Sequence, residues 1–284
     1  MIHPVRVAHR GASGSGLAPE NTLAAFERAI QLGVDAVEID VRATRDGVVV
    51  VMHDPTIDRT TNQEGPVDEW TFSQLREADA GGWFGPGFAG ERIPTLQEVF
   101  DLVRHRAVAV VEIKADWLAE RVLKVAHDVD VVDQIVIQSF SPETVRRINA
   151  VDPSVPTAFL LGNLPTSPAR MRARRVAREV LAVGANILNV WHAALTPPFF
   201  EEMRKRGVSV WTWTVDEEAV MRDVIQMGVH GVITNHPDRL NRVLEELENE
   251  GAILVPMGRR QRLKPSRWRR RRQIRKVSRR RRPG

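Results

Sequence analysis

The stretch AVEIDVRATRDGVVVVMHD, residues 36–54, predicts a β-hairpin with polar chemistry on one face. Its first arm alternates apolar and acidic side chains, so a strand there places Glu38 and Asp40 on the same face. Asp46-Gly47, between two apolar runs, is the strongest short signal for a two-residue type I′ turn. Counting outward from that turn pairs Asp40 with His53. The hairpin therefore predicts two carboxylates and an imidazole at one height, which suits a metal site with an acid-base group beside it.

Outside the hairpin, strand patterns and helix patterns alternate along the chain, and the run 48–53 is the returning arm of the hairpin. Eight strands, each followed by a helix, predict an α/β protein with a (β/α)₈ TIM barrel; a doubly wound open sheet is the alternative. The predicted strands are 5–9, 35–41, 107–114, 135–140, 156–161, 186–191, 208–214 and 230–234. The predicted helices are one opened by Pro19-Glu20-Asn21-Thr22 and those at 95–105, 116–128, 142–150, 167–183, 197–206, 216–227 and 237–250.

Residues 55–93 interrupt this rhythm. Glycines recur through the second half of the segment, among the aromatic residues Trp70, Trp83, Phe84 and Phe88. We interpret the segment as a small insertion with a modest core and many loops. Long loops in barrels usually serve the active-site face.

The composition divides the chain into two parts. Residues 259–284 hold 15 of the 41 Lys and Arg residues and none of the 36 acidic ones, so the remainder carries a net charge of −10. We therefore expect a barrel domain over residues 1–251 and a basic, disordered tail over residues 252–284. Such a tail is suited to contact an anionic membrane or a nucleic acid.

The hydrophobic fraction of 43% supports a sizeable core, and there are no cysteines. No stretch approaches the ~20 apolar residues that span a bilayer, so we expect no transmembrane segment. A strand pattern begins almost at the N-terminus, where a secretory signal would carry an apolar run. The expected location is the cytoplasm.

Active sites of TIM barrels lie at the C-terminal ends of the strands. Glu112 and Lys114, two residues apart on one strand, add a third carboxylate and a cation to the hairpin set. Three carboxylates without thiolates favour a hard divalent cation, Mg²⁺ or Ca²⁺, with Mn²⁺ as a further option. His9 and Arg10 follow the first strand. Cations for an oxyanion and two histidines for proton transfer suit in-line displacement at phosphorus.

Eight short motifs follow one another along the chain: His9-Arg10-Gly11, Pro19-Glu20-Asn21-Thr22, Glu38-Ile39-Asp40, Asp46-Gly47, His53-Asp54, Arg59-Thr60-Thr61, Pro94-Thr95-Leu96 and Glu112-Ile113-Lys114. With these motifs, residues 5 to about 245 resemble the glycerophosphodiester phosphodiesterase family. The resemblance implies a (β/α)₈ barrel with an insertion after the hairpin, and hydrolysis of glycerophosphodiesters to glycerol 3-phosphate and an alcohol.

The same resemblance implies roles for individual residues. Glu38, Asp40 and Glu112 would hold the metal, and His9 and His53 would be the acid-base pair, with the order of their roles left open. The phosphate would be bound by Arg10 and Lys114 with Glu20 nearby, and Trp213 is a further candidate for contact with the substrate.

Two positions depart from the family pattern. Trp213-Thr214-Val215-Asp216 stands where the family usually has Trp-Thr-Val-Asn, and Thr234-Asn235 stands where a Thr-Asp pair is usual. Both positions lie outside the metal and histidine set, so we expect them to bear on substrate choice.

Two other functions remain open from the sequence. A phosphodiesterase of lysophospholipase D type would need an apolar groove, which Trp83, Phe84 and Phe88 could supply. A polyanion-binding or nucleic-acid-binding protein would act through the arginine runs 269–272 and 279–282.

Overall fold

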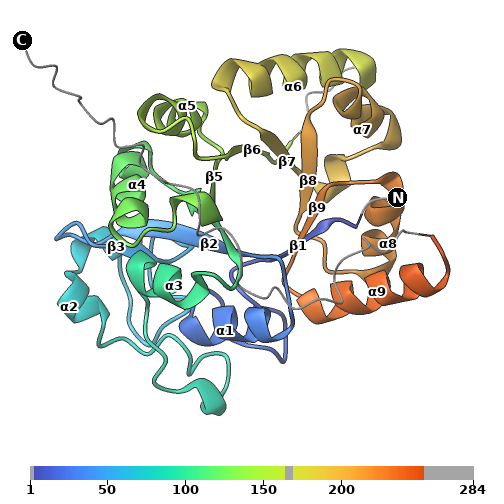
Figure 1. Ribbon diagram of the computed structural model, residues 1–284. Helices are drawn as coiled ribbons and strands as arrows, with labels where there is room; N and C mark the ends of the chain where they lie inside the picture. The colour runs from blue at the N-terminus through green and yellow to red at the C-terminus, as the bar shows by residue number, and fades with distance from the viewer. Residues whose placement is uncertain (1–2, 164–168, 253–284) are drawn as a thin grey trace, which may run out of the picture.

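Eight parallel strands form a closed barrel surrounded by helices (Figure 1). The computed structural model describes residues 3–163 and 169–252. Around the ring the strands follow the order β1-β9-β8-β7-β6-β5-β4-β2, and β1 also pairs with β2. That last pairing closes the sheet on itself, so the open doubly wound alternative is excluded. The predicted TIM barrel is confirmed.

The strands of the ring are β1 (Val5–Ala8), β2 (Ala36–Ala43), β4 (Val108–Ile113), β5 (Ile135–Ser139), β6 (Thr157–Leu161), β7 (Ile187–Trp191), β8 (Ser209–Trp213) and β9 (Gly231–Thr234), and β3 (Val49–Val51) is antiparallel to β2. The helices are α1 (Leu23–Gln31), α2 (Phe72–Leu75), α3 (Leu96–Val103), α4 (Ala119–Asp128), α5 (Pro142–Val151), α6 (Ala169–Val183), α7 (Pro197–Arg204), α8 (Glu218–Met227) and α9 (Pro237–Asn249).

Short polar signals start and stop the helices. Thr22 begins α1 by accepting a hydrogen bond from the backbone N–H of Ala25. Thr95 begins α3 within a capping box: its hydroxyl accepts from the Glu98 backbone N–H, and the Glu98 carboxylate accepts from the Thr95 backbone N–H. Gly228 ends α8 in the left-handed conformation, at φ 96°. These signals explain why the predicted helices agree with the observed ones to within a few residues.

The hairpin register differs from the prediction by one residue. The structure pairs Val41 with Val51, which places Asp40 opposite Met52, and the Met52 N–H donates to the Asp40 carbonyl at 3.0 Å. The predicted pairing of Asp40 with His53 is therefore wrong. His53 nevertheless reaches the cavity described below, because β3 ends at Val51 and the chain then leaves the sheet.

The turn itself explains the shift in register. A type I′ turn requires positive φ at both central residues, but only Gly47 of the pair Asp46-Gly47 has it, at 81°. Asp46 accepts hydrogen bonds from Thr44 Oγ1 at 2.6 Å and from the Phe72 N–H at 2.9 Å. The loop thereby contains three residues, 45–47. The Thr44 N–H donates a hydrogen bond across it to the Val48 carbonyl at 3.0 Å.

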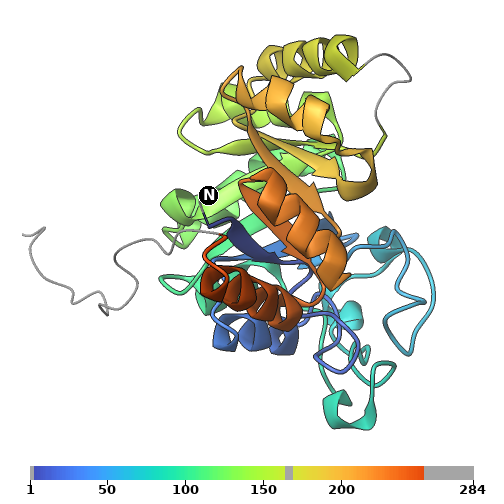
Figure 2. The same ribbon diagram turned by 90° about the vertical axis from the view of Figure 1, so that its right-hand side faces the viewer.

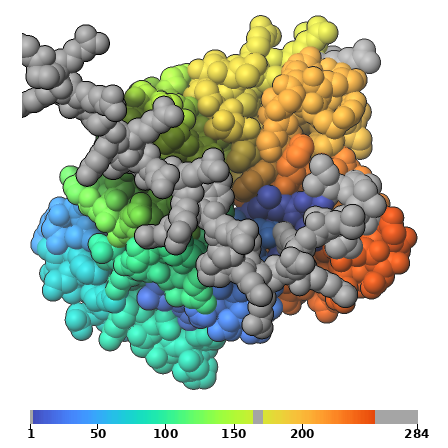
Figure 3. Space-filling view, viewed as in Figure 1, coloured from blue at the N-terminus to red at the C-terminus, as the bar shows by residue number. Residues whose placement is uncertain are grey.

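The insertion 55–93 is a compact lobe with its own small core. Buried residues from the returning arm and from the insertion pack together there, among them Met52, Ile57, Val67 and Leu75. In Figure 2 its loops extend to the lower right, away from the labelled N-terminus. In Figure 3 the insertion, coloured cyan and teal, forms the lower left flank, whereas α6 and α7 form the upper right.

The inside of the barrel is filled by one cluster with a member from every strand of the ring. Its buried members are Val7, Ala36, Val110, Val136, Ala158, Ile187, Trp211 and Ile233. Trp211 needs a glycine opposite it on β9, because a Cβ on Gly231 would lie 2.6 Å from the indole. Two further apolar clusters lie between the strands and the helices, one on each half of the barrel.

Among the described residues, no helix combines the length and apolar character needed to cross a bilayer. Of the predicted tail only Ala252 is described, so the expected contacts of the tail lie outside the described residues.

Candidate active site

Three carboxylates converge at the end of the barrel where β2 and β4 finish. Asp40 and Glu112 are partners in the register of these neighbouring strands, and Glu38 lies one layer deeper on β2. One oxygen of each of the three lies within 4.8 Å of the others, and all three side chains are buried. This confirms that the strand pattern brings Glu38, Asp40 and Glu112 together.

The cluster fits a divalent cation. Its donors are carboxylate oxygens alone, which hard cations prefer. Lys114 Nζ lies 2.7 Å from Asp40 Oδ1 and already faces that buried oxygen with a positive charge. The three carboxylates still lie within 4.8 Å of one another, and a divalent cation among them would offset their mutual repulsion.

Two cations flank the carboxylates. Lys114 Nζ lies 2.5 Å from Glu112 Oε1, and Arg10 Nε lies 3.2 Å from Asp40 Oδ2. Arg10 is held from behind by Glu20, at 2.8 Å, and Glu20 is in turn bound by Arg59 at 2.7 Å. Glu20 therefore reaches the site through Arg10 rather than by lining the cavity.

The pKa values of the three carboxylates are shifted in opposite directions. Burial, followed by the charge of Asp40, raises the pKa of Glu38 well above its usual range and raises the pKa of Glu112. Burial acts in the same direction on Asp40, but Lys114 and Arg10 outweigh it and hold the pKa of Asp40 well below its usual range. Although burial acts to lower the pKa of Lys114, Asp40 and Glu112 raise it overall. A divalent cation would favour the ionised forms of Glu38 and Glu112.

The two histidines have different partners. His9 Nδ1 lies 2.7 Å from Asn235 Oδ1, and its Nε2 faces Glu38 at 4.0 Å. His53 Nδ1 lies 2.6 Å from the carboxylate of Asp54. Burial, followed by the charge of Arg10, lowers the pKa of His9 to about 4, and burial also lowers the pKa of His53. His9 is thus neutral at physiological pH.

The backbone after β1 is strained where it supports the site. Arg10 and Asn21 adopt positive φ, at 56° and 57°, which is uncommon for residues other than glycine. In that conformation the Arg10 N–H donates to Glu38 Oε2 at 3.0 Å, and Asn21 Nδ2 donates to Asp40 Oδ2 at 2.9 Å. Each strained residue thereby fixes one carboxylate.

A cavity of about 280 Å³ lies over these groups. Of the predicted site residues, all but Asp40 and Glu20 line it: His9, Arg10, Glu38, His53, Glu112, Lys114 and Trp213. Trp213 forms an apolar wall with Phe140, with ring centroids 5.6 Å apart in an edge-to-face arrangement. The cavity therefore combines a charged floor with an aromatic side.

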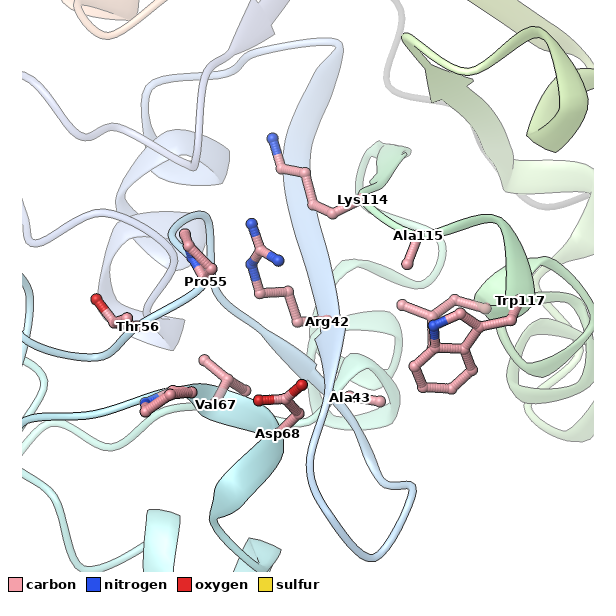
Figure 4. Close-up of a pocket in the computed structure, with 11 residues that line it drawn as sticks. Arg42, Ala43, Pro55, Thr56, Val67, Asp68, Lys114, Ala115 and Trp117 are labelled. Carbon is pink, nitrogen blue, oxygen red and sulfur yellow. The ribbon is translucent and has the colours of Figure 1, made fainter.

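A second cavity, of about 250 Å³, shares Lys114 with the first. Figure 4 shows the side chains of Lys114 and Arg42 pointing the same way, with Asp68 and Trp117 farther along the cavity. Arg42 is engaged by the carbonyl oxygen of His53, at 2.8 Å and 2.9 Å. The insertion thus contributes to a hollow beside the site, through Asp68.

The aromatic residues Trp83, Phe84 and Phe88 of the insertion lie outside the two cavities. Trp83, Phe84 and Phe88 pack edge to face on one another, with ring centroids 5.5–5.6 Å apart. Of the described residues that line the two cavities, none is one of these three.

Sequence reasoning missed the polar residues that support the site. Gln138 donates to Glu38 at 3.2 Å, and the buried Asn189 donates to Gln138 at 2.8 Å. A signal for Asn189 was available, because a buried amide inside an apolar strand must have a polar partner. Arg42 lies on the same face of β2 as Glu38 and Asp40. The alternation of side chains along a strand could therefore have placed Arg42 beside the site as well.

Comparisons with known proteins agree with this geometry. Residues 9–239 match the model of the Glycerophosphoryl diester phosphodiesterase family. The glycerophosphodiester phosphodiesterase of Caldanaerobacter subterraneus subsp. tengcongensis is 38% identical over 240 residues, covering 82% of this chain and 95% of that protein. One from Bacillus subtilis is 33% identical over 255 residues, covering 84% and 85%.

A solved structure shows the same likeness. The crystal structure of glycerophosphodiester phosphodiesterase from Agrobacterium tumefaciens superposes with a TM-score of 0.72 at 31% identity, covering 84% of this chain and all of that one. The family match spans most of the chain, and the three carboxylates, the two cationic side chains and the two histidines of the site lie inside it. The chain therefore belongs to the glycerophosphoryl diester phosphodiesterase family, a family of hydrolases.

Proposed function

We propose that this protein hydrolyses glycerophosphodiesters to sn-glycerol 3-phosphate and an alcohol, with the help of one divalent cation. The observation that carries the proposal is the convergence of three carboxylates within 4.8 Å, beside Lys114 and Arg10 and facing a cavity that both histidines line. Such a floor complements a phosphodiester, whose negative charge grows on the oxygens around phosphorus in the transition state.

Each residue has a role in this proposal. Glu38, Asp40 and Glu112 hold the cation, which is Mg²⁺ or Ca²⁺, with Mn²⁺ as a further option. When bound, the cation supplies positive charge against the phosphoryl oxygens. Lys114 and Arg10 bind and orient the phosphate, and Glu20 keeps Arg10 in place through their 2.8 Å ion pair.

The histidines move the protons. One of His9 and His53 removes a proton from the attacking water, and the other protonates the leaving alkoxide. Asp54 can stabilise a proton on His53 directly, at 2.6 Å, whereas the partner of His9 is a neutral amide. This difference favours His53 as the proton donor and His9 as the proton acceptor.

The two cavities give the diester two directions in which to extend. Lys114 lines both, so a phosphate bound at Lys114 leaves the glycerol half against Trp213 and Phe140 and the alcohol half toward Arg42 and Asp68. Trp83, Phe84 and Phe88, which a lysophospholipase D activity would use as its apolar groove, line neither of these cavities, so the soluble diester is the favoured substrate.

The test is hydrolysis of a panel of soluble glycerophosphodiesters and lysolipids, with release of sn-glycerol 3-phosphate as the readout. We expect turnover of the soluble diesters with added Mg²⁺, Mn²⁺ or Ca²⁺ and its loss in EDTA. Full turnover in EDTA would contradict the role of the cation, and turnover of lysolipids alone would replace the proposed substrate class.

A further inference from the structure

Asp216 and Asn235 are in contact with each other, and Asn235 is in contact with His9. Asp216 follows β8 and Asn235 follows β9, its neighbour in the ring. Asn235 Nδ2 donates to Asp216 Oδ2 at 2.7 Å, and Asn235 Oδ1 lies 2.7 Å from His9 Nδ1. A continuous chain of hydrogen bonds therefore links the carboxylate of Asp216 to the imidazole of His9.

The chemistry of the partners fixes the direction of this chain. Asp216 Oδ1 accepts from the Asn235 N–H at 2.9 Å and from Thr234 Oγ1 at 3.0 Å. The hydroxyl hydrogen of Thr234 does point to Asp216, because Thr234 Oγ1 itself accepts from the His236 N–H at 2.9 Å. An ionised carboxylate can accept hydrogen bonds but cannot donate them. The Asn235 side chain must therefore turn its NH₂ group, the donor, toward Asp216.

The orientation of the amide then decides the tautomer of the histidine. With its NH₂ group on Asp216, Asn235 presents its oxygen to His9, and Ser13 Oγ lies 2.9 Å from the same oxygen. An amide oxygen cannot donate, so the hydrogen of a neutral His9 must be on Nδ1. The lone pair of the ring is then on Nε2, the nitrogen that faces Glu38 and the cavity.

We propose that Asp216 and Asn235 are positioning residues that lock His9 in the Nδ1–H tautomer and so set it to accept a proton at Nε2. The acceptor role rests on the proposed function, whereas the tautomer does not. In the reaction, the oxygen of the attacking water forms a bond to phosphorus as its proton passes to His9 Nε2. The bond from phosphorus to the alcohol oxygen breaks, and the leaving alkoxide takes its proton from His53. The other hydrogen stays on Nδ1 throughout, hydrogen-bonded to Asn235 Oδ1.

The carboxylate of Asp216 and the amide of Asn235 are complementary, and the same complementarity would hold with the two groups exchanged. Either order gives an acceptor for His9 Nδ1 and one N–H···O bond between the two side chains. A single exchange instead sets two carboxylates or two amides face to face. The order found here also keeps the negative charge one side chain away from His9.

The test uses Asp216→Asn, Asn235→Asp and the double exchange. We expect each single variant to lose at least about tenfold in kcat, and the double variant to recover most of that loss, since coupling energies of contacting pairs reach a few kcal/mol. The double variant has the composition of the wild type, so it is the matched control. A double variant that melts like the wild type but stays as slow as the single variants would overturn the proposal.

A second measurement does not depend on activity. In protein with ¹⁵N-labelled histidine, with His9 assigned by the signals lost in His9→Gln, we expect a protonated Nδ1 and an unprotonated Nε2 at neutral pH. Asp216→Asn should admit the other tautomer. A wild-type His9 with its hydrogen on Nε2 would refute the lock. If the wild type hydrolysed no diester, the proposed function would fail while the ¹⁵N result still decided the tautomer.

Discussion

Replacing Glu112 by Gln separates cation binding from folding, because the shape is kept and one charge is lost. In the cation-free protein, at an effective dielectric of about 20, the change removes about 7 kcal/mol of attraction to Lys114 at 2.5 Å. It also removes the repulsion from the ionised Asp40 within 4.8 Å, about 3.5 kcal/mol, together with the desolvation cost of one buried carboxylate, which is several kcal/mol. The opposing changes nearly cancel, so the cation-free variant should unfold within about 2 kcal/mol of the wild type.

The bound state has no such compensation. One of three anionic ligands is lost, and we expect the Kd for the cation to rise at least about 100-fold, or about 2.7 kcal/mol. At a cation concentration of about 100 times the wild-type Kd, binding stabilises the wild type by about 2.7 kcal/mol and this variant by about 0.4 kcal/mol. Turnover should fall with the affinity.

The assay is urea unfolding with and without the cation, together with calorimetric titration and hydrolysis. Glu245→Gln, on the exposed surface of α9, is the matched control and should behave as the wild type in all three. A Glu112→Gln variant with wild-type cation affinity would refute the ligand assignment. A cation-free variant destabilised by several kcal/mol would refute the cancellation.

Three further outcomes are expected. His9→Ala and His53→Ala should each lower kcat by about 10²–10⁴-fold while cation-dependent stabilisation is kept, and losses below tenfold in both would mean that neither histidine transfers a proton. Because burial lowers the pKa of His9 from 6.5 to about 4, the neutral form stabilises the fold above pH 6.5 and that stability is lost as the pH falls toward 4. The free energy of unfolding of the cation-free protein, measured in urea, should therefore fall between pH 7 and pH 5 by about 2 kcal/mol less in His9→Gln than in the wild type. Equal decreases in the two proteins would contradict the shifted pKa of His9. Finally, the full chain should bind heparin at low salt whereas residues 1–258 should not, with hydrolysis of a soluble diester unchanged; heparin binding by the shorter chain would place the polyanion site in the barrel.

The barrel was predictable from the sequence because every strand and helix carries its own signal. Period-2 alternation on β2 placed Glu38 and Asp40 on one face, and spacing along β4 added Glu112 and Lys114. These inferences need only the geometry of single strands. The convergence of the three carboxylates then follows from the parallel order of the strands.

The register of the hairpin and the partners of His9 were not predictable in the same way. The register depended on Thr44 and Phe72 binding the Asp46 carboxylate, and Phe72 lies far along the chain. Asp216 and Asn235 follow two different strands and are 19 residues apart in the sequence. Nothing in the sequence around either residue indicates that the two side chains are in contact. Only the closed ring shows that they form one pair.

The division of the outer apolar residues into two clusters has a consequence for how the site is assembled during synthesis. The first cluster runs from β1 to α5, so the half of the chain that carries the carboxylates, the cations and both histidines can bury apolar surface as soon as it leaves the ribosome. Asn235, which holds His9, emerges only after all eight strands of the ring. A half-made chain thus possesses the reactive groups without the support of His9, and it is the pairing of β9 with β1 that brings Asn235 to His9.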